Sequence, residues 1–114
     1  MKSKVALRSL AVLALAICWP ACVGASASAE ELVKSRFKLG AKTFDEAGCA
    51  QCHKLQSAEA TGSYAPSFDG NKHLTVDLIR KTVSEGRGDM PSFGGIFSEE
   101  QIKALSEYIM SAKK

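Results

Sequence analysis

The stretch GCAQCHKLQ, residues 48–56, constrains this chain more than any other. It places Cys49 and Cys52 three positions apart, and His53 follows the second cysteine directly. Two thiols and an imidazole on so short a segment can act together on one bound group. The whole chain has four cysteines and two histidines, so the nature of that group depends on which of the others belong to the working protein.

The other two cysteines lie in an N-terminal segment that has the form of a secretory signal peptide. Residues 1–8 carry three basic residues and no acid, residues 10–19 read LAVLALAICW, and residues 24–29 read GASASA. A basic start, a short apolar run and a small-residue end are typical of an export signal. The apolar run is shorter than the roughly 20 residues that span a bilayer, which disfavours an uncleaved anchor. We therefore predict a signal peptide over 1–29, which is removed, and one domain over 30–114.

Removal of this leader changes the net charge. The leader holds three of the 15 basic residues and none of the 12 acidic ones, so residues 30–114 carry 12 of each and the whole-chain charge of +3 falls to zero. A neutral domain lacks the positive field that attracts nucleic acid, and we expect no nucleic-acid partner and no membrane span after cleavage. The expected location is the periplasm, or the thylakoid lumen if the source is photosynthetic.

Three kinds of site can be built from Cys49, Cys52 and His53. A redox disulfide of the thioredoxin type would accompany a βαβ pattern, but no period-two strand is visible. A zinc site needs about four ligands, and His73 is the only other histidine. The pattern C-x-x-C-H is the attachment motif of haem c, in which both thiols add to vinyl groups of the porphyrin and the imidazole binds iron. The sequence favours covalent haem, linked through Cys49 and Cys52 and ligated by His53.

The second axial position of such an iron has three candidate occupants. Met90 lies in EGRGDMPSFGG, residues 85–95, whose glycines and proline indicate a loop that can aim a thioether at a metal. Met110 points away from the apolar face of a predicted C-terminal helix. His73 would give a bis-histidine haem. We favour Met90, and an open position is the remaining alternative, as is a Met90 that only fills a gap in the core.

Apolar residues at helical spacing predict three helices. The first helix covers 30–47, and its apolar stripe consists of Leu32, Val33, Phe37, Gly40 and Phe44. The second covers 75–86, from an N-cap at Thr75 to a stop at Gly86, and its stripe consists of Leu78, Ile79 and Val83. The third covers 98–112 and begins with a capping box of Ser98 and Gln101; its stripe consists of Ile102, Leu105, Tyr108, Ile109 and Ala112. The intervening segments 54–72 and 86–97 show little periodicity. Loops this long are unusual in a small domain, but they make sense if they wrap a porphyrin.

Taken in order, these motifs resemble the class I cytochrome c family, and above all its small bacterial and photosynthetic members. The resemblance is carried by Gly40-x-x-x-Phe44, the pentapeptide CAQCH, APSF (65–68), GRGDMPSFGG (86–95) and LSEYI (105–109). It implies an all-α cytochrome c fold of three to four helices packed around one covalently bound haem c. It also implies His53 and Met90 as axial ligands, with the ring N–H of His53 donated to the carbonyl of Pro66.

The resemblance implies a function as well. A haem ligated on both sides has no free position for a substrate, so we expect a soluble, monomeric electron shuttle that is not an enzyme. Its partners would be a membrane cytochrome complex, an oxidase, a reductase or a dehydrogenase. The alternative is a haem enzyme or gas-binding sensor with a displaceable distal ligand. Residues 30–114 contain no tryptophan, so the propionate contact that some relatives make through an indole would fall to Tyr64, Arg80 or Arg87.

Overall fold

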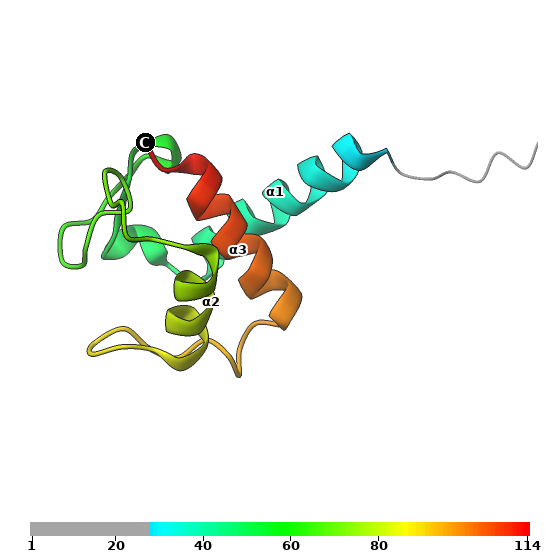
Figure 1. The fold of residues 1–114 in the computed structure, drawn as a ribbon. Helices are drawn as coiled ribbons and strands as arrows, with labels where there is room; N and C mark the ends of the chain where they lie inside the picture. The colour runs from blue at the N-terminus through cyan, green and yellow to red at the C-terminus, as the bar shows by residue number, and fades with distance from the viewer. Residues whose placement is uncertain (1–27) are drawn as a thin grey trace, which may run out of the picture.

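The computed structural model describes residues 28–114, which form three α-helices and one short β-hairpin (Figure 1). The predicted signal peptide therefore lies, apart from its last two residues, outside the described residues. No helix in the described range is long and apolar enough to cross a membrane. The elements are α1 (Ala29–Glu46), β1 (Lys54–Leu55), β2 (Ala60–Thr61), α2 (Val76–Glu85) and α3 (Glu99–Ala112), with 3₁₀ turns at Cys49–Gln51 and Gln56–Ala58. The predicted all-α class is confirmed.

Side-chain caps set where each helix begins. The Thr75 hydroxyl accepts a hydrogen bond from the Leu78 amide at 3.1 Å and opens α2. Ser98 and Gln101 form the predicted capping box, in which each side chain accepts from the other residue's amide. Such caps satisfy amides that have no partner inside the helix. The three predicted helices are correct to within one residue at each end. For α2 and α3 the reason is that these caps and the stop at Gly86 are visible in the sequence.

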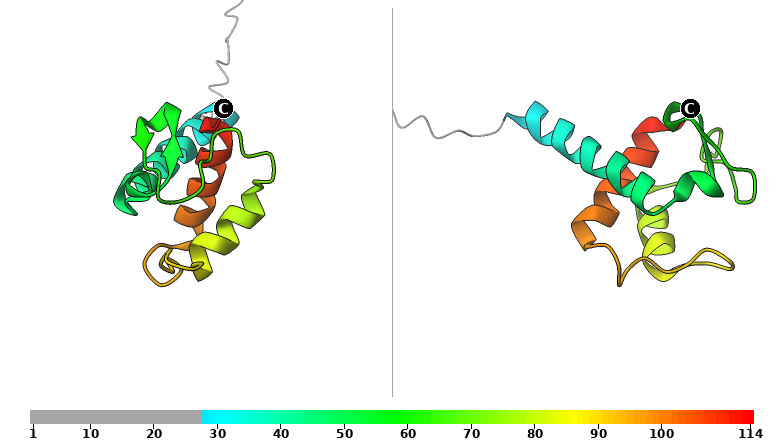
Figure 2. Two further views of the ribbon diagram at one scale, coloured as in Figure 1. Left: turned by 90° about the vertical axis from the view of Figure 1, so that its left-hand side faces the viewer. Right: turned by 180° about the vertical axis from the view of Figure 1, so that it is seen from behind.

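Helices α1 and α3 cross at Gly40, and both views of Figure 2 keep the two helices in contact. A Cβ atom added at Gly40 would lie 2.5 Å from Cβ of Tyr108 and closer still to the carbonyl oxygen of Ala104. The missing side chain thus lets the two backbones approach. The Tyr108 ring then packs edge-on against Phe37 and Phe44, with centroids 4.9 and 5.8 Å away. Gly40 and Tyr108 therefore meet where the two helices cross.

The N-terminal half of α1 is not buried, although its apolar stripe continues there. The exposed fractions are 56% for Leu32, 70% for Val33 and 48% for Phe37, whereas Gly40 and Phe44 are buried. Figure 1 shows the reason: α3 crosses α1 near its middle, so the first turns of α1 extend beyond the rest of the fold. The apolar stripe of α1 therefore faces the core only in its second half.

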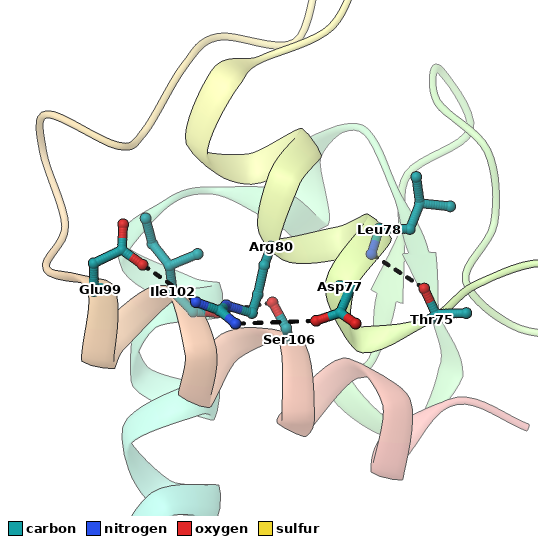
Figure 3. Close-up of polar contacts among 7 residues, drawn as sticks. All are labelled: Thr75, Asp77, Leu78, Arg80, Glu99, Ile102 and Ser106. Carbon is teal, nitrogen blue, oxygen red and sulfur yellow. Dashed lines mark hydrogen bonds and ion pairs between the residues drawn. The ribbon is translucent and has the colours of Figure 1, made fainter.

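Helix α2 packs on α3 through apolar and ionic contacts. Ile79 and Val83 are buried in the shared core. The Arg80 guanidinium lies 3.4 Å from the carboxylate of Glu99 on α3 and 4.0 Å from that of Asp77 on its own helix (Figure 3). Partly exposed pairs of this kind contribute about 0–1 kcal/mol each, so the buried residues supply most of the α2–α3 stability. The core consists of Phe44, Leu55, Ala60, Phe68, Ile79, Val83, Ile102, Leu105, Tyr108 and Ile109.

The β-hairpin was not predicted. Lys54 pairs with Thr61 and Leu55 with Ala60, and Glu59 turns the chain with a φ of 54°. Two residues per strand are too few to show an alternating pattern, so no period-two signal is visible in the sequence. The hairpin buries Leu55 and returns the chain toward the cysteine motif, which positions the segment described next.

Candidate haem site

The cysteine motif begins where α1 ends. Gly48 adopts φ 69°, in the left-handed region that glycine tolerates best, and reverses the chain after the helix. The following residues form a tight turn, in which the Cys52 and His53 amides both donate to the carbonyl of Cys49, at 3.2 and 2.9 Å. Cys49 and Cys52 are free thiols and both are half-buried. The turn therefore brings two thiols and one imidazole together, as their spacing predicts.

The imidazole of His53 is fixed in one orientation. Its Nδ1 lies 2.7 Å from the carbonyl oxygen of Pro66, and its ring stacks on Phe68 with centroids 4.5 Å apart. A carbonyl oxygen can only accept, so Nδ1 carries the proton and donates it. The other ring nitrogen, Nε2, then keeps a lone pair that can bind a metal, and the hydrogen bond raises its basicity. The bond to Pro66 that the family resemblance implied is confirmed.

Backbone contacts hold the Pro66 segment against the cysteine motif. The Ala65 amide donates to the Cys52 carbonyl at 2.9 Å, and the Phe68 amide donates to the Lys54 carbonyl at 3.0 Å. Gly62 makes this approach possible, because a Cβ there would lie 2.5 Å from the carbonyl carbon of Cys52. This role of Gly62 was not predicted from the sequence. The chain brings Gly62 back to Cys52 through the β-hairpin, which was itself not predicted.

Met90 lies in a loop that is tied to α2. Its amide and carbonyl exchange hydrogen bonds of 3.0 Å with the carbonyl and amide of Arg87, which makes a tight turn. The next residues are anchored to the end of α2, where the Phe93 amide donates to the Val83 carbonyl at 2.9 Å. The Met90 side chain is half-buried and packs against the core. Backbone hydrogen bonds therefore fix the predicted loop in place, and the Met90 thioether lies at the boundary between the core and the surface.

A side-chain hydrogen bond joins the two segments that carry Pro66 and Met90. The Tyr64 hydroxyl donates to a carboxylate oxygen of Asp89 at 2.6 Å, although Tyr64 as a residue is 73% exposed. This bond to a carboxylate raises the pKa of Tyr64 above its ordinary value, because the protonated phenol is the form that donates. Sequence reasoning considered Tyr64 only as a propionate partner and did not connect it with Asp89.

The remaining candidates lie elsewhere. His73 is exposed in a turn, where its amide donates to the side chain of Asn71 at 3.0 Å. Met110 is half-buried on α3 and packs against the core. Arg80 is engaged in its ion pairs with acidic side chains, whereas Arg87 is exposed beside Met90.

The two non-haem readings find little support. Residues 28–114 hold no group of three or more His, Cys, Asp or Glu side chains placed to bind a metal ion, as a zinc site requires. Burial raises the pKa of Cys49 to about 11, so its thiol is protonated at neutral pH. Cysteines that act in disulfide exchange have lowered pKa values instead. The donors present fit haem c. They are two thiols on one turn, an imidazole nitrogen with its lone pair available and a soft thioether.

The fold and these donors define a c-type cytochrome, and comparison with known proteins agrees. Residues 35–109 match the family model described as "Cytochrome C oxidase, cbb3-type, subunit III". The chain belongs to this cytochrome c family, whose cofactor is haem c and whose members transfer electrons.

Individual relatives place the chain among the small members. It is 32% identical over 74 residues to cytochrome c6 of Leptolyngbya boryana, covering 62% of this chain and 86% of that one. It is also 32% identical over 79 residues to the cbb3-type oxidase subunit CcoP of Helicobacter pylori (strain 52), covering 65% of this chain but 27% of the subunit. The crystal structure of the c-type cytochrome SorU from Sinorhizobium meliloti superposes with a TM-score of 0.63 at 32% identity, over 69% of this chain and 92% of that one. The chain is therefore a small class I c-type cytochrome.

Proposed function

We propose that residues 30–114 carry one haem c and work as an electron shuttle. In this proposal Cys49 and Cys52 form the two thioether links, and His53 and Met90 are the axial ligands. The observation that carries it is the hydrogen bond from Nδ1 of His53 to Pro66, because it orients the imidazole and leaves Nε2 as the ligating atom. Phe68 supports the same orientation from one face of the ring.

The donor set favours electron transfer over catalysis. When bound, the haem iron supplies a one-electron couple between its ferric and ferrous states. A neutral thioether from Met90 would stabilise the ferrous state and raise the potential relative to bis-histidine ligation. With His53 and Met90 both holding the iron, no site would remain for a substrate. We therefore infer that the protein is not an enzyme, and that it passes single electrons between other proteins.

We further propose that the chain is exported and that residues 1–29 are removed. The mature monomer would exchange electrons in the periplasm with a membrane cytochrome complex, an oxidase, a reductase or a dehydrogenase. Such encounters are transient and use small interfaces. The exposed lysines Lys54, Lys72 and Lys81 are candidates to steer them. Because Ser28 caps α1 by accepting from the Glu31 amide, cleavage after Ala29 would remove one cap. N-terminal sequencing of the exported protein identifies the cut.

The axial assignment is tested by three variants of the holoprotein. Met90→Ala should lower the midpoint potential, remove the weak sulfur-to-iron charge-transfer band in the red and let the ferrous protein bind CO. Met110→Ala is the matched control, because it removes the other thioether of the domain, and it should change none of these. His73→Ala tests the rival ligand and should leave the spectrum unchanged.

Two outcomes would change the proposal. A low-spin, CO-resistant haem in Met90→Ala, together with loss of that state in His73→Ala, would move the axial ligand to His73. Ready CO binding by the wild-type ferrous protein would mean an open sixth position. The protein would then be a haem enzyme or gas sensor, and the shuttle assignment would fail.

A further inference from the structure

The Tyr64–Asp89 hydrogen bond joins two segments that are far apart in the sequence. Tyr64 lies two residues before Pro66, which holds His53, and Asp89 immediately precedes Met90. Within residues 28–114, no other hydrogen bond connects 60–68 with 86–97. The bond therefore links the segment on the His53 side of the site directly to the segment on the Met90 side.

Both ends of this bond are anchored. Beside Tyr64, the Ala65 amide is bound to the Cys52 carbonyl at 2.9 Å. Beside Asp89, the Met90 backbone is paired twice with Arg87. Because each anchor restricts its own segment, the side-chain bond restrains the distance between the two segments. Its length of 2.6 Å is in the range of charge-assisted O–H···O⁻ bonds, which are the stronger kind.

Burial does not explain why a tyrosine stands at position 64. The residue is 73% exposed, so its ring adds little to the core. Burial is also not the role of Asp89, which is exposed. The feature that the two residues share is the hydrogen bond itself, which is formed at the tip of the Met90 turn.

We propose that the Tyr64–Asp89 bond is a latch that holds the Met90 segment closed over the site and limits access of outside ligands to the iron. This inference rests on the proposed ligation by Met90. Opening of the Met90 segment exposes the sixth position, so the apparent affinity for an external ligand is proportional to the open fraction. Loss of the latch raises that fraction and leaves the covalent attachment and His53 in place.

The test is an imidazole titration of the ferric holoprotein, followed through the red charge-transfer band. Tyr64→Phe removes one hydroxyl and keeps the ring, and Asp89→Ala removes the acceptor. Each should lower the apparent dissociation constant for imidazole by about 2- to 12-fold. This is the range of one ordinary net hydrogen bond, because solvent around these two exposed side chains offsets the gain from the charge of Asp89. The double variant should bind no more tightly than Asp89→Ala alone, because both changes break the same bond. Asp89→Asn keeps an acceptor oxygen and should recover part of the wild-type affinity.

Tyr108→Phe is the matched control, because it removes the hydroxyl of the domain's other tyrosine, at the crossing of α1 and α3. It should leave imidazole binding unchanged. A merely structural role of Tyr64 would lower the melting temperature and leave the imidazole affinity at its wild-type value, which would overturn the latch. Failure of the Met90 ligation has a different signature: the wild-type protein would lack the red band, and Met90→Ala would not alter imidazole binding. Wild-type imidazole affinity in both Tyr64→Phe and Asp89→Ala, with the band present, overturns the latch alone.

Discussion

Substitution of Gly40 tests how closely α1 and α3 must approach. An added Cβ would lie 2.5 Å from Cβ of Tyr108 and 2.9 Å from the carbonyl carbon of Ala104. These neighbours belong to the backbone or are attached directly to it, so no flexible side chain can move aside and the helices must separate. Separation also disturbs the edge-on packing of Tyr108 against Phe44.

The size of the effect follows from two opposing terms. Overpacking costs about 1–3 kcal/mol, and sometimes more, whereas replacing glycine inside a helix gains about 1 kcal/mol. Gly40→Ala should therefore destabilise the domain by about 0–2 kcal/mol. Gly40→Leu adds more atoms to the same space and should cost about 3 kcal/mol. For a domain of this size, that loss lowers the melting temperature by about 12–24 °C.

Thermal unfolding of the holoprotein, followed by far-ultraviolet circular dichroism, measures this loss. Gly95→Ala is the control, because a Cβ at that position would meet no atom within 4 Å. It should change the stability by no more than about 0.5 kcal/mol. Unchanged melting of Gly40→Leu would refute the close crossing and the packing argument built on it.

Two further predictions concern the loop beside the haem motif and the C-terminus. Gly62→Ala places a Cβ 2.7 Å from the His53 amide nitrogen, so it should destabilise the domain by about 1–3 kcal/mol. It should also reduce the yield of haem-loaded protein, which is measured as haem absorbance per mole of chain. The Asp69 carboxylate accepts hydrogen bonds from the backbone amides of Lys114 and Gln56, at 3.0 and 2.8 Å. These two bonds hold the pKa of Asp69 below its ordinary value. A carboxyl group whose pKa is lowered on folding stabilises the fold at pH values above its ordinary pKa. This stabilisation is lost as the pH falls through the lowered pKa. Asp69→Ala should therefore lower the melting temperature at neutral pH, and the difference from wild type should vanish in strong acid; a difference that persists there would contradict the assignment.

The helices could be predicted from the sequence because their signals are local. Thr75, Gly86, Ser98 and Gln101 each act within one turn of their own position, so caps and stops are visible without tertiary structure. Burial is not local. Leu78 belongs to the apolar stripe of α2 but is 41% exposed, because the angle at which a helix meets its neighbour decides which part of a stripe is covered.

The candidate donors are visible in the sequence, whereas the contacts that support them are not. Cys49, Cys52 and His53 are adjacent in sequence, so their meeting needs no long-range information. The hydrogen bond from His53 to Pro66 was expected only because the motifs resemble a known family, since nothing local joins residues 13 positions apart. The bond from Tyr64 to Asp89 spans 25 positions and joins two irregular segments, so no periodicity could reveal it.

The central claim is that the cysteine motif binds one haem covalently, and the mass of the denatured chain tests it most directly. Intact-mass spectrometry under denaturing conditions removes any group held only by folding or by axial ligation, and it keeps a group held by thioethers. We predict the mass of the mature chain plus that of one haem, and Cys49→Ala together with Cys52→Ala should abolish the increment. A wild-type mass equal to that of the polypeptide alone, from protein that was coloured before denaturation, would contradict the claim.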